Sequence, residues 1–461
     1  MSDEKTVKDT APNEEGVSRR QLLVRSAAGA AAVGAAGIGA YAHHKTKGTE
    51  HDEFPVEIKD DLKPMDQRNM LWTFSASAML HAEHPERVEA FGGFNFYERL
   101  MGGYLEGPNR DEPGYTQLDK ALAAAAWEGN EFLAPGQQYG QPNSGILHWD
   151  QSDVNTTEYT FESKDEATLA IRSAARVLKA TRCGITRPDA RWDYDPLYDI
   201  DNERTLSWED DFPFKPKTVI VMLTEMDYEG IATSPAWTSM APAGEEYVMG
   251  DKCAGQMAKF LRGLGFQAVG SNNDLGMNVP YAVAAGLGEA GRNGSLIAPT
   301  IGPRHRICKV YTDFDFVNYD KPRSFGVASF CKECMRCADS CPAEAISMDK
   351  DPTWGPEYEG ADVPHYTYPN RAGILKYHND SKKCLKFWIE NDGGCQNCIS
   401  ACPYNKPEFW HHRLVDASNV ISPGPVHAFM REMDIIFGYG TTFDQKRATA
   451  FWKSGKDMRG G

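Results

Sequence analysis

The sequence contains no excess of basic residues and, beyond its first 42 residues, no long apolar run. Its 461 residues include 65 Asp and Glu against 49 Lys and Arg, which gives a formal net charge of −16. This charge argues against nucleic acid or an anionic bilayer surface as a partner. A transmembrane helix needs about 20 strongly apolar residues in a row, and no segment reaches that length. With 41% hydrophobic and 11% aromatic residues, the chain is predicted to be globular, with two or three domains.

The N-terminal segment 1–42 is predicted to be a targeting signal rather than part of the fold. A twin arginine at 19–20 precedes an Ala/Gly-rich run at 26–42, and residues 40–42 have the A-x-A pattern of a cleavage site. The run is short and weakly apolar, so a transmembrane anchor is the less favoured interpretation. Export by the twin-arginine route would deliver a folded chain, beginning near His43, to the outer face of the cytoplasmic membrane.

Eight of the 11 cysteines fall in two runs. Cys331–Pro342 has the spacing C-x2-C-x2-C-x3-C-P, and Cys384–Pro403 repeats its second half after a longer first spacer. This spacing is typical of ferredoxins with two [4Fe-4S] clusters, in which the fourth Cys of each run ligates the other cluster. One predicted ligand set is therefore Cys331, Cys334, Cys337 and Cys402. The other predicted set is Cys341, Cys384, Cys395 and Cys398.

Other uses of these cysteines are less favoured. Zinc knuckles usually present two separated Cys pairs, and disulfide scaffolds are short chains. The remaining Cys183, Cys253 and Cys308 stand alone and are expected to be small buried hydrophobes. The clusters need only about 90 residues, so most of the chain must serve a purpose that a ferredoxin does not explain.

Hydrophobic periodicity between the signal and the cysteines predicts a layered α/β architecture. Residues 43–165 mix Pro/Gly loops with aromatic stretches and contain one Ala-rich helix at 118–127. After them, helices and strands alternate, which favours sheets covered by helices. The predicted helices are 166–179 and 245–264, and the predicted strands are 218–223, 266–269 and 307–312.

Gly286, Gly288 and Gly291 form a G-x-G-x-x-G pattern, the fingerprint of dinucleotide sites. The context argues against that function, because an Ala-rich, helix-like run precedes the glycines and no helix follows them. Residues without a Cβ still allow the backbone to approach a flat ligand closely. The three glycines are therefore cofactor-binding candidates.

Six segments together resemble the catalytic subunit of respiratory reductive dehalogenases of the tetrachloroethene-reducing type. They are 113–122, 264–274, 285–294, 302–313, 320–326 and 384–388. The resemblance implies an α+β protein with a nitroreductase-like core that binds a corrinoid, followed by a ferredoxin-like domain with two [4Fe-4S] clusters. The implied divisions are a signal at 1–42, a variable region contributing to the substrate pocket at 43–165, the corrinoid-binding domain at 166–322, the cluster domain at 323–415 and a C-terminal extension at 416–461.

The same resemblance implies the site residues. Reductive cleavage of a carbon–halogen bond needs two electrons, one proton and a place for the departing halide. The proton donor would be Tyr247, with Asn273 and Arg306 beside it, since a nearby guanidinium favours the phenolate. Trp388 would line the substrate pocket. Taken alone, these residues suit half-buried packing, a polar turn, a surface ion pair and an aromatic beside a cluster.

The corrinoid would lack a protein ligand on its cobalt. Many corrinoid proteins supply a His from the pattern D-x-H-x-x-G, but none of the 12 His here has an Asp two residues before it. We therefore expect a base-off corrinoid of the cobalamin or norpseudocobalamin type.

The implied partners are an organohalide substrate, a separate small integral-membrane anchor subunit and a quinol- or hydrogenase-linked electron donor. Two alternatives remain. An epoxyqueuosine-reductase-like enzyme would share the corrinoid and clusters, although the signal and the acidic charge oppose it. A non-catalytic ferredoxin-type carrier would hold clusters and no corrinoid.

Overall fold

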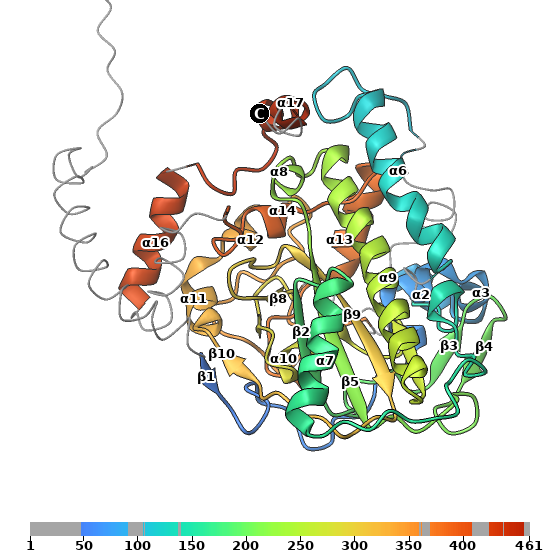
Figure 1. Cartoon of the computed structure of the whole chain (residues 1–461). Helices are drawn as coiled ribbons and strands as arrows, with labels where there is room; N and C mark the ends of the chain where they lie inside the picture. The colour runs from blue at the N-terminus through green and yellow to red at the C-terminus, as the bar shows by residue number, and fades with distance from the viewer. Residues whose placement is uncertain are drawn as a thin grey trace, which may run out of the picture.

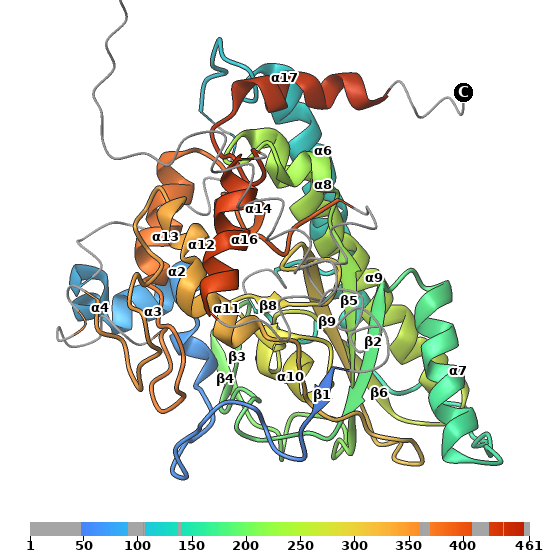
Figure 2. The same ribbon diagram turned by 90° about the vertical axis from the view of Figure 1, so that its left-hand side faces the viewer.

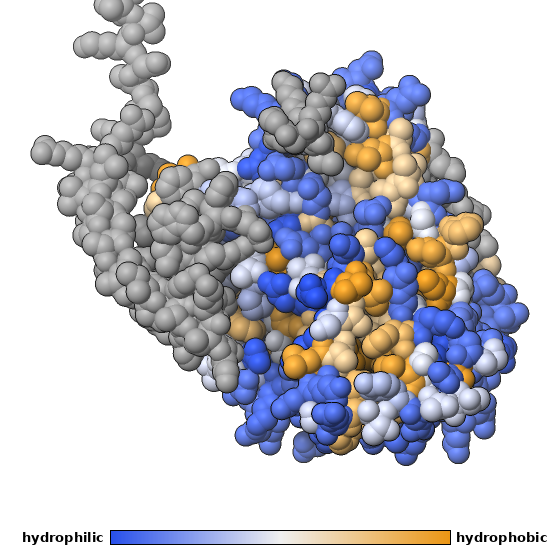
Figure 3. Space-filling model, in the orientation of Figure 1, coloured by the Kyte–Doolittle hydropathy of each residue, from blue (hydrophilic) through white to orange (hydrophobic). Residues whose placement is uncertain are grey.

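The computed structural model describes residues 48–90, 105, 107–136, 140–358, 361, 369–407, 424–436 and 438–455. Helices pack around a central sheet (Figure 1). Figure 3 shows apolar residues lying among polar ones on the same face of the molecule. The predicted signal at 1–42 lies outside the described residues. Within these ranges, no helix combines the length and the apolar character that crossing a membrane requires.

The core is a four-stranded sheet in the order β2-β5-β9-β6, and all neighbouring strands run antiparallel. The strands are β2 (Arg182–Thr186), β5 (Thr218–Glu225), β6 (Ala268–Ser271) and β9 (His305–Thr312). The predictions of strands at 218–223, 266–269 and 307–312 are confirmed, with β6 displaced by two residues. Strand β2 was not among the predicted strands.

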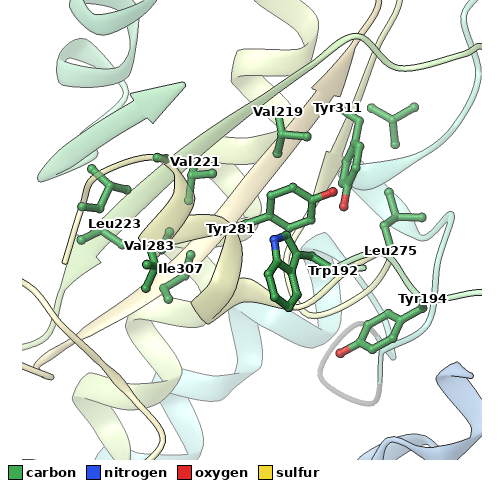
Figure 4. Packing of buried hydrophobic residues seen from close by; sticks show 14 of the residues in the cluster. Trp192, Tyr194, Val219, Val221, Leu223, Leu275, Tyr281, Val283, Ile307 and Tyr311 are labelled. Carbon is green, nitrogen blue, oxygen red and sulfur yellow. The ribbon is translucent and has the colours of Figure 1, made fainter. Parts of the chain in front are cut away.

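Successive side chains of the two central strands point to opposite faces of the sheet. One face packs against α7 (Lys164–Val177) and α9 (Met240–Gly263), and the other packs against α10 (Asn278–Ala284). Figure 4 shows side chains of this second face. The residues facing α7 and α9 include Ile220, Met222, Cys308 and Val310. Those facing α10 include Val219, Val221, Ile307 and Tyr311. This alternation decides which side chains of β9 reach the candidate site.

The helix α6 (Gln117–Leu133) joins the N-terminal region to this core by packing along α9. The two helices approach closely because glycines lie at their contact. A Cβ built at Gly244 would lie 2.7 Å from Trp127 Cδ1, and one at Gly129 would lie 2.9 Å from Val248 Cγ1. The predicted helix at 118–127 is confirmed and continues for six more residues, to Leu133.

The remaining elements are short. Before the core lie β1 (Thr49–Glu50), η1 (Gln67–Asn69), α2 (Leu71–Ala76), α3 (Ala78–Glu83), α4 (Pro85–Ala90) and η3 (Gly145–Leu147). Within it lie β3 (Leu197–Asp199), β4 (Arg204–Leu206), α8 (Tyr228–Ile231), η4 (Trp237–Ser239), β7 (Glu289–Ala290) and β8 (Leu296–Ile297). After it lie β10 (Arg323–Ser324), α11 (Val327–Cys334), α12 (Arg336–Asp339), α13 (Ser381–Glu390), α14 (Asn397–Ser400), α16 (Gly424–Ile436) and α17 (Gln445–Ser454).

The cysteine-rich segment forms a group of helices beside the sheet. Figure 2 shows α11, α12 and α13 on one side of the molecule and the strands of the central sheet on the other. At the start of this segment, β10 pairs with β1, so residues near position 50 border the cysteine-rich segment. The predicted boundary between 165 and 166 falls inside α7. The N-terminal region, the central sheet with its helices and the cysteine-rich segment are therefore in contact with one another in the fold.

Candidate active site and thiol groups

Two groups of four thiols lie in the segment from α11 to α14. The first group, Cys331, Cys334, Cys337 and Cys402, lines one pocket. In the second group, burial raises the pKa of Cys384 well above its usual value, and the thiols of Cys398, Cys395 and Cys341 raise it further, so these four lie together. The structure thus brings together the two sets that the crossing rule predicts, with Cys341 and Cys402 exchanged between the runs.

Each of the two groups holds the four thiols that a [4Fe-4S] cluster requires. Among the described residues, no three His, Cys, Asp or Glu side chains come close enough to hold one metal ion. Zinc requires its sulfur ligands at about 2.3 Å, whereas a cube of four irons has its thiolates at separate corners. Burial raises the pKa of Cys334 and of Cys395 to about 12. Cluster assembly must therefore displace these protons.

A buried arginine supports the first thiol group. Arg292, only 1% exposed, lies between β7 and β8. Its guanidinium donates to the carbonyl of Cys331 at 3.1 Å and 3.0 Å, and to those of Ser347 and Asp349 at 2.8 Å and 2.7 Å. A single side chain thus ties the loop before β8 to two separate parts of the cysteine-rich segment.

The three candidate glycines lie at close contacts within this chain. A Cβ at Gly286 would lie 2.5 Å from the Lys321 carbonyl oxygen, and its φ of +70° also favours glycine. A Cβ at Gly288 would lie 2.5 Å from the Ile297 carbonyl oxygen. Gly291 lines the pocket of the first thiol group. Packing accounts for glycine at 286 and 288, and their contact with a flat ligand stays a prediction.

Tyr247, Asn273 and Arg306 come together from three elements. Tyr247 lies on α9, Asn273 follows β6 and Arg306 lies on β9, on the face that α9 covers. Asn273 Nδ2 donates to the Tyr247 hydroxyl oxygen at 3.2 Å, and the Arg306 guanidinium carbon lies 4.8 Å from the centre of the Tyr247 ring. Trp127 of α6 packs against the same ring, with centroids 5.3 Å apart.

This site adjoins the second thiol group. Burial raises the pKa of Cys398 to about 11, and Arg306 is among the groups that oppose the rise, so the guanidinium lies near this thiol. Trp127 and Cys398 also pack against the same apolar cluster, which contains Met226 and Ile399. A hydroxyl, a guanidinium and a thiol group are therefore neighbours.

The asparagine that precedes Asn273 is held by a buried carboxylate. Asn272 Nδ2 donates to Asp251 Oδ1 at 2.9 Å, and Asn130 Nδ2 donates to Asp251 Oδ2 at 2.6 Å. Burial raises the pKa of Asp251 to about 7, and the two amides oppose the rise. This network ties α6, α9 and the end of β6 together, and so fixes the backbone from which Asn273 projects.

Trp388 lies on α13, four residues after Cys384. Its ring packs against that of Trp72, with centroids 5.5 Å apart, in a cluster with Leu71 and Leu385. Its Nε1 is buried and has no hydrogen-bond partner among the residues that the structure describes. Trp388 therefore lies on the same helix as one of the thiols of the second group, and its contact with substrate stays a prediction.

Sequence reasoning missed several residues at the site. Trp127 packs against the Tyr247 ring. Glu246 precedes Tyr247 in the chain; burial raises the pKa of Glu246 to about 7, and the charge of Arg306 acts against this rise. No sequence signal marks these two as site residues. Lys309 was detectable, because it is a charged residue with apolar residues on both sides of it in β9, Ile307 and Cys308 before it and Val310 and Tyr311 after it. Asn278 carries no such signal.

Comparisons with known proteins found one family model and several curated relatives that match this chain. A family model described as a 4Fe-4S dicluster domain matches residues 330–406. The tetrachloroethene reductive dehalogenase of Desulfitobacterium hafniense (strain Y51) is 38% identical over 75% of this chain and 72% of its own length. The enzyme of the same name from Sulfurospirillum multivorans is 32% identical over 74% of this chain and 71% of its own.

A solved structure shares the fold. It is titled "Reductive dehalogenase structure suggests a mechanism for B12-dependent dehalogenation", and it matches with a TM-score of 0.63 and 19% identity. The match covers 85% of this chain and 49% of that chain, so the present chain spans about half the length of that protein. On the evidence of the curated relatives, the chain belongs to the reductive dehalogenases, a family of corrinoid-dependent oxidoreductases that remove halide from organohalides.

Proposed function

We propose that this chain removes halide from an organohalide at a bound corrinoid, with electrons supplied through two [4Fe-4S] clusters. The overall reaction is R–X + 2e⁻ + H⁺ → R–H + X⁻. The observation that carries the proposal is the position of Arg306, which lies over the Tyr247 ring and near enough to Cys398 to act on its thiol. A proton donor and a cation thereby adjoin the predicted electron path. Membership of the family sets aside the epoxyqueuosine-reductase alternative.

The residues around Tyr247 fit a polar ligand. Arg306 Nε and Trp127 Nε1 are both buried, and neither has a hydrogen-bond partner within the described ranges. Buried donors of this kind need acceptors, which the amide groups of a corrinoid or a halide ion would provide. The antiparallel sheet with helices on both faces supports a nitroreductase-like core. When bound, the corrinoid would supply low-potential electrons to the carbon–halogen bond.

The protein's own part is to deliver a proton and to accommodate charge. Tyr247 would give its hydroxyl proton to the carbon that loses halide, and Arg306 would stabilise the phenolate left behind. The same guanidinium would attract the departing halide. Asn273 donates to the tyrosine oxygen and would stabilise its negative charge. Trp127 shields one side of the Tyr247 ring.

The cellular setting is part of the proposal. The twin arginine at 19–20 and the A-x-A pattern at 40–42 support export to the outer face of the cytoplasmic membrane. A separate small membrane anchor and a quinol- or hydrogenase-linked donor would complete a respiratory chain that ends on the organohalide. The lack of D-x-H in the sequence supports a base-off corrinoid of the cobalamin or norpseudocobalamin type.

The test is a cofactor and substrate assay on anaerobically purified protein. We expect about eight iron atoms per chain, from two four-iron clusters, with one corrinoid recovered by acid extraction. Reduced methyl viologen should then drive halide release from at least one compound in a panel of chlorinated ethenes, ethanes and phenols. Full iron with no cobalt, even after reconstitution, would instead favour the electron-carrier alternative.

A further inference from the structure

A row of hydrogen bonds leads from a buried lysine to the Tyr247 hydroxyl. Lys309 of β9 is completely buried, and its Nζ donates to the Asn272 carbonyl at 2.8 Å and to Asn278 Oδ1. Asn278, the first residue of α10, donates through Nδ2 to Asn273 Oδ1 at 3.1 Å. Asn273 Nδ2 in turn donates to the Tyr247 oxygen at 3.2 Å. Three side chains thus lie in series before the tyrosine.

The direction of this row is fixed by groups that cannot reverse their role. A charged lysine can only donate, so the Asn278 carbonyl oxygen must face it. The Ile307 carbonyl can only accept, and it takes a hydrogen bond from Asn278 Nδ2 at 3.1 Å. Both constraints give the Asn278 amide the same orientation, and Asn278 then sets that of Asn273.

We propose that Asn278 and Lys309 are positioning residues that keep the Tyr247 hydroxyl hydrogen directed away from Asn273 and available to substrate. An Asn273 amide free to turn over could present its oxygen to Tyr247 and hold that hydrogen itself. The inference rests on the proposed function, in which Tyr247 gives up this proton. It adds two residues that do not contact Tyr247.

The surroundings of Lys309 set its role as a hydrogen-bond donor to Asn278. Burial lowers its pKa to about 8, while the carboxylates of Asp274 and Asp193 and the Cys308 thiol act against that change. Asp274 follows β6, and Asp193, which precedes β3, accepts hydrogen bonds from Tyr281 and Tyr311 at 2.6 Å and 2.8 Å. Figure 4 shows these two tyrosine hydroxyls close together. Both groups that Nζ contacts, the Asn272 carbonyl and Asn278 Oδ1, accept hydrogen bonds, so Lys309 serves as a donor here.

Asn278→Asp tests the row with little change of shape. The new carboxylate can still accept from Lys309, but it cannot donate to Asn273, so the Asn273 amide should turn over. Lys309→Met removes the anchor itself. For both variants we expect kcat to fall about tenfold or more, the effect of losing one aligned hydrogen bond, while KM stays within about twofold and the iron and cobalt contents stay unchanged. Val279→Ala, on the next residue of α10, is the matched control and should keep kcat within about twofold.

A spectroscopic measurement separates orientation from turnover. The tyrosine Fermi doublet in the Raman spectrum reports whether a hydroxyl donates or accepts a hydrogen bond, and subtraction of Tyr247→Phe holoenzyme isolates Tyr247. In Asn278→Asp, the doublet ratio should move toward that of a donating hydroxyl, whereas Val279→Ala should leave it unchanged. An unchanged ratio in Asn278→Asp, with kcat as in the wild type, overturns the proposal. If Tyr247→Phe itself turned over normally, the proposed proton donor would fail, while the ratio would still decide whether the row orients the hydroxyl.

Discussion

The contact between α6 and α9 gives a quantitative prediction, because one glycine of α9 lies against α6 and another has open space around it. A Cβ at Gly244 would lie 2.7 Å from Trp127 Cδ1 and 2.8 Å from Cγ and Nε1. Favourable carbon contacts begin near about 3.5 Å, so the indole must move. At Gly263, the last residue of α9, a Cβ would meet no heavy atom of the described residues within 4 Å.

The expected energies follow from these contacts. Overpacking costs about 1–3 kcal/mol, and replacing a helical glycine by alanine returns up to about 1 kcal/mol. Gly244→Ala should therefore destabilise the protein by roughly 0–2 kcal/mol. Gly263→Ala should stabilise it by up to about 1 kcal/mol. The displaced Trp127 ring also packs against Tyr247, so turnover should fall in Gly244→Ala and not in Gly263→Ala.

The assay compares unfolding and halide release in both variants and in the wild type, at equal cobalt and iron content. Chemical denaturation followed by circular dichroism gives the stability difference, and reduced methyl viologen drives turnover. If Gly244→Ala matched Gly263→Ala in both measurements, Trp127 would not be held against α9 as described. The aromatic wall beside Tyr247 would then need another explanation.

Two further outcomes test the surroundings of the site. Burial raises the pKa of Asp251 to about 7, so its contribution to stability is present below about pH 4 and is lost as the pH rises through 7. Asp251→Asn should therefore reduce the fall in the free energy of unfolding between pH 5 and pH 8. An unchanged fall would contradict the raised pKa of Asp251. Arg292→Met removes the donors to the carbonyls of Cys331, Ser347 and Asp349. The iron–sulfur absorbance of this variant should bleach faster in air than that of the wild type. An equal rate would show that the Arg292 hydrogen bonds do not protect the cluster expected at the first thiol group.

The core strands were predictable because burial on both faces leaves largely apolar runs. Strand β2 was not, since it includes Gly184, whose packing appears only in the fold: a Cβ there would lie 2.4 Å from the Ala285 carbonyl oxygen. Helix α9 begins five residues earlier than predicted, and Pro242 lies in its first turn, where proline is tolerated. Local sequence does not reveal which glycine is needed for a close contact in the fold or at which residue a helix begins.

The thiol groups and the Tyr247 site differ in how far sequence could predict them. Cysteine spacing alone is enough to propose the two ligand sets, because the chemistry of the cluster dictates it. Tyr247, Asn273 and Arg306 come from separate elements, and only a family resemblance singled them out. Trp127 and Asn278 required the structure, since neither differs in sequence from ordinary helix residues. The charge of Lys309 between apolar neighbours of β9 was visible in the sequence, but its hydrogen-bond partners were not.

The most direct test of the account is halide release by Tyr247→Phe that carries full cobalt and iron. With photochemically reduced enzyme in a single turnover, the wild type should release about one halide per cobalt. Tyr247→Phe should release halide at least about a hundredfold more slowly, the usual size of a lost general acid. Release at the wild-type rate would show that the proton comes from elsewhere and that the site beside Cys398 has been wrongly assigned.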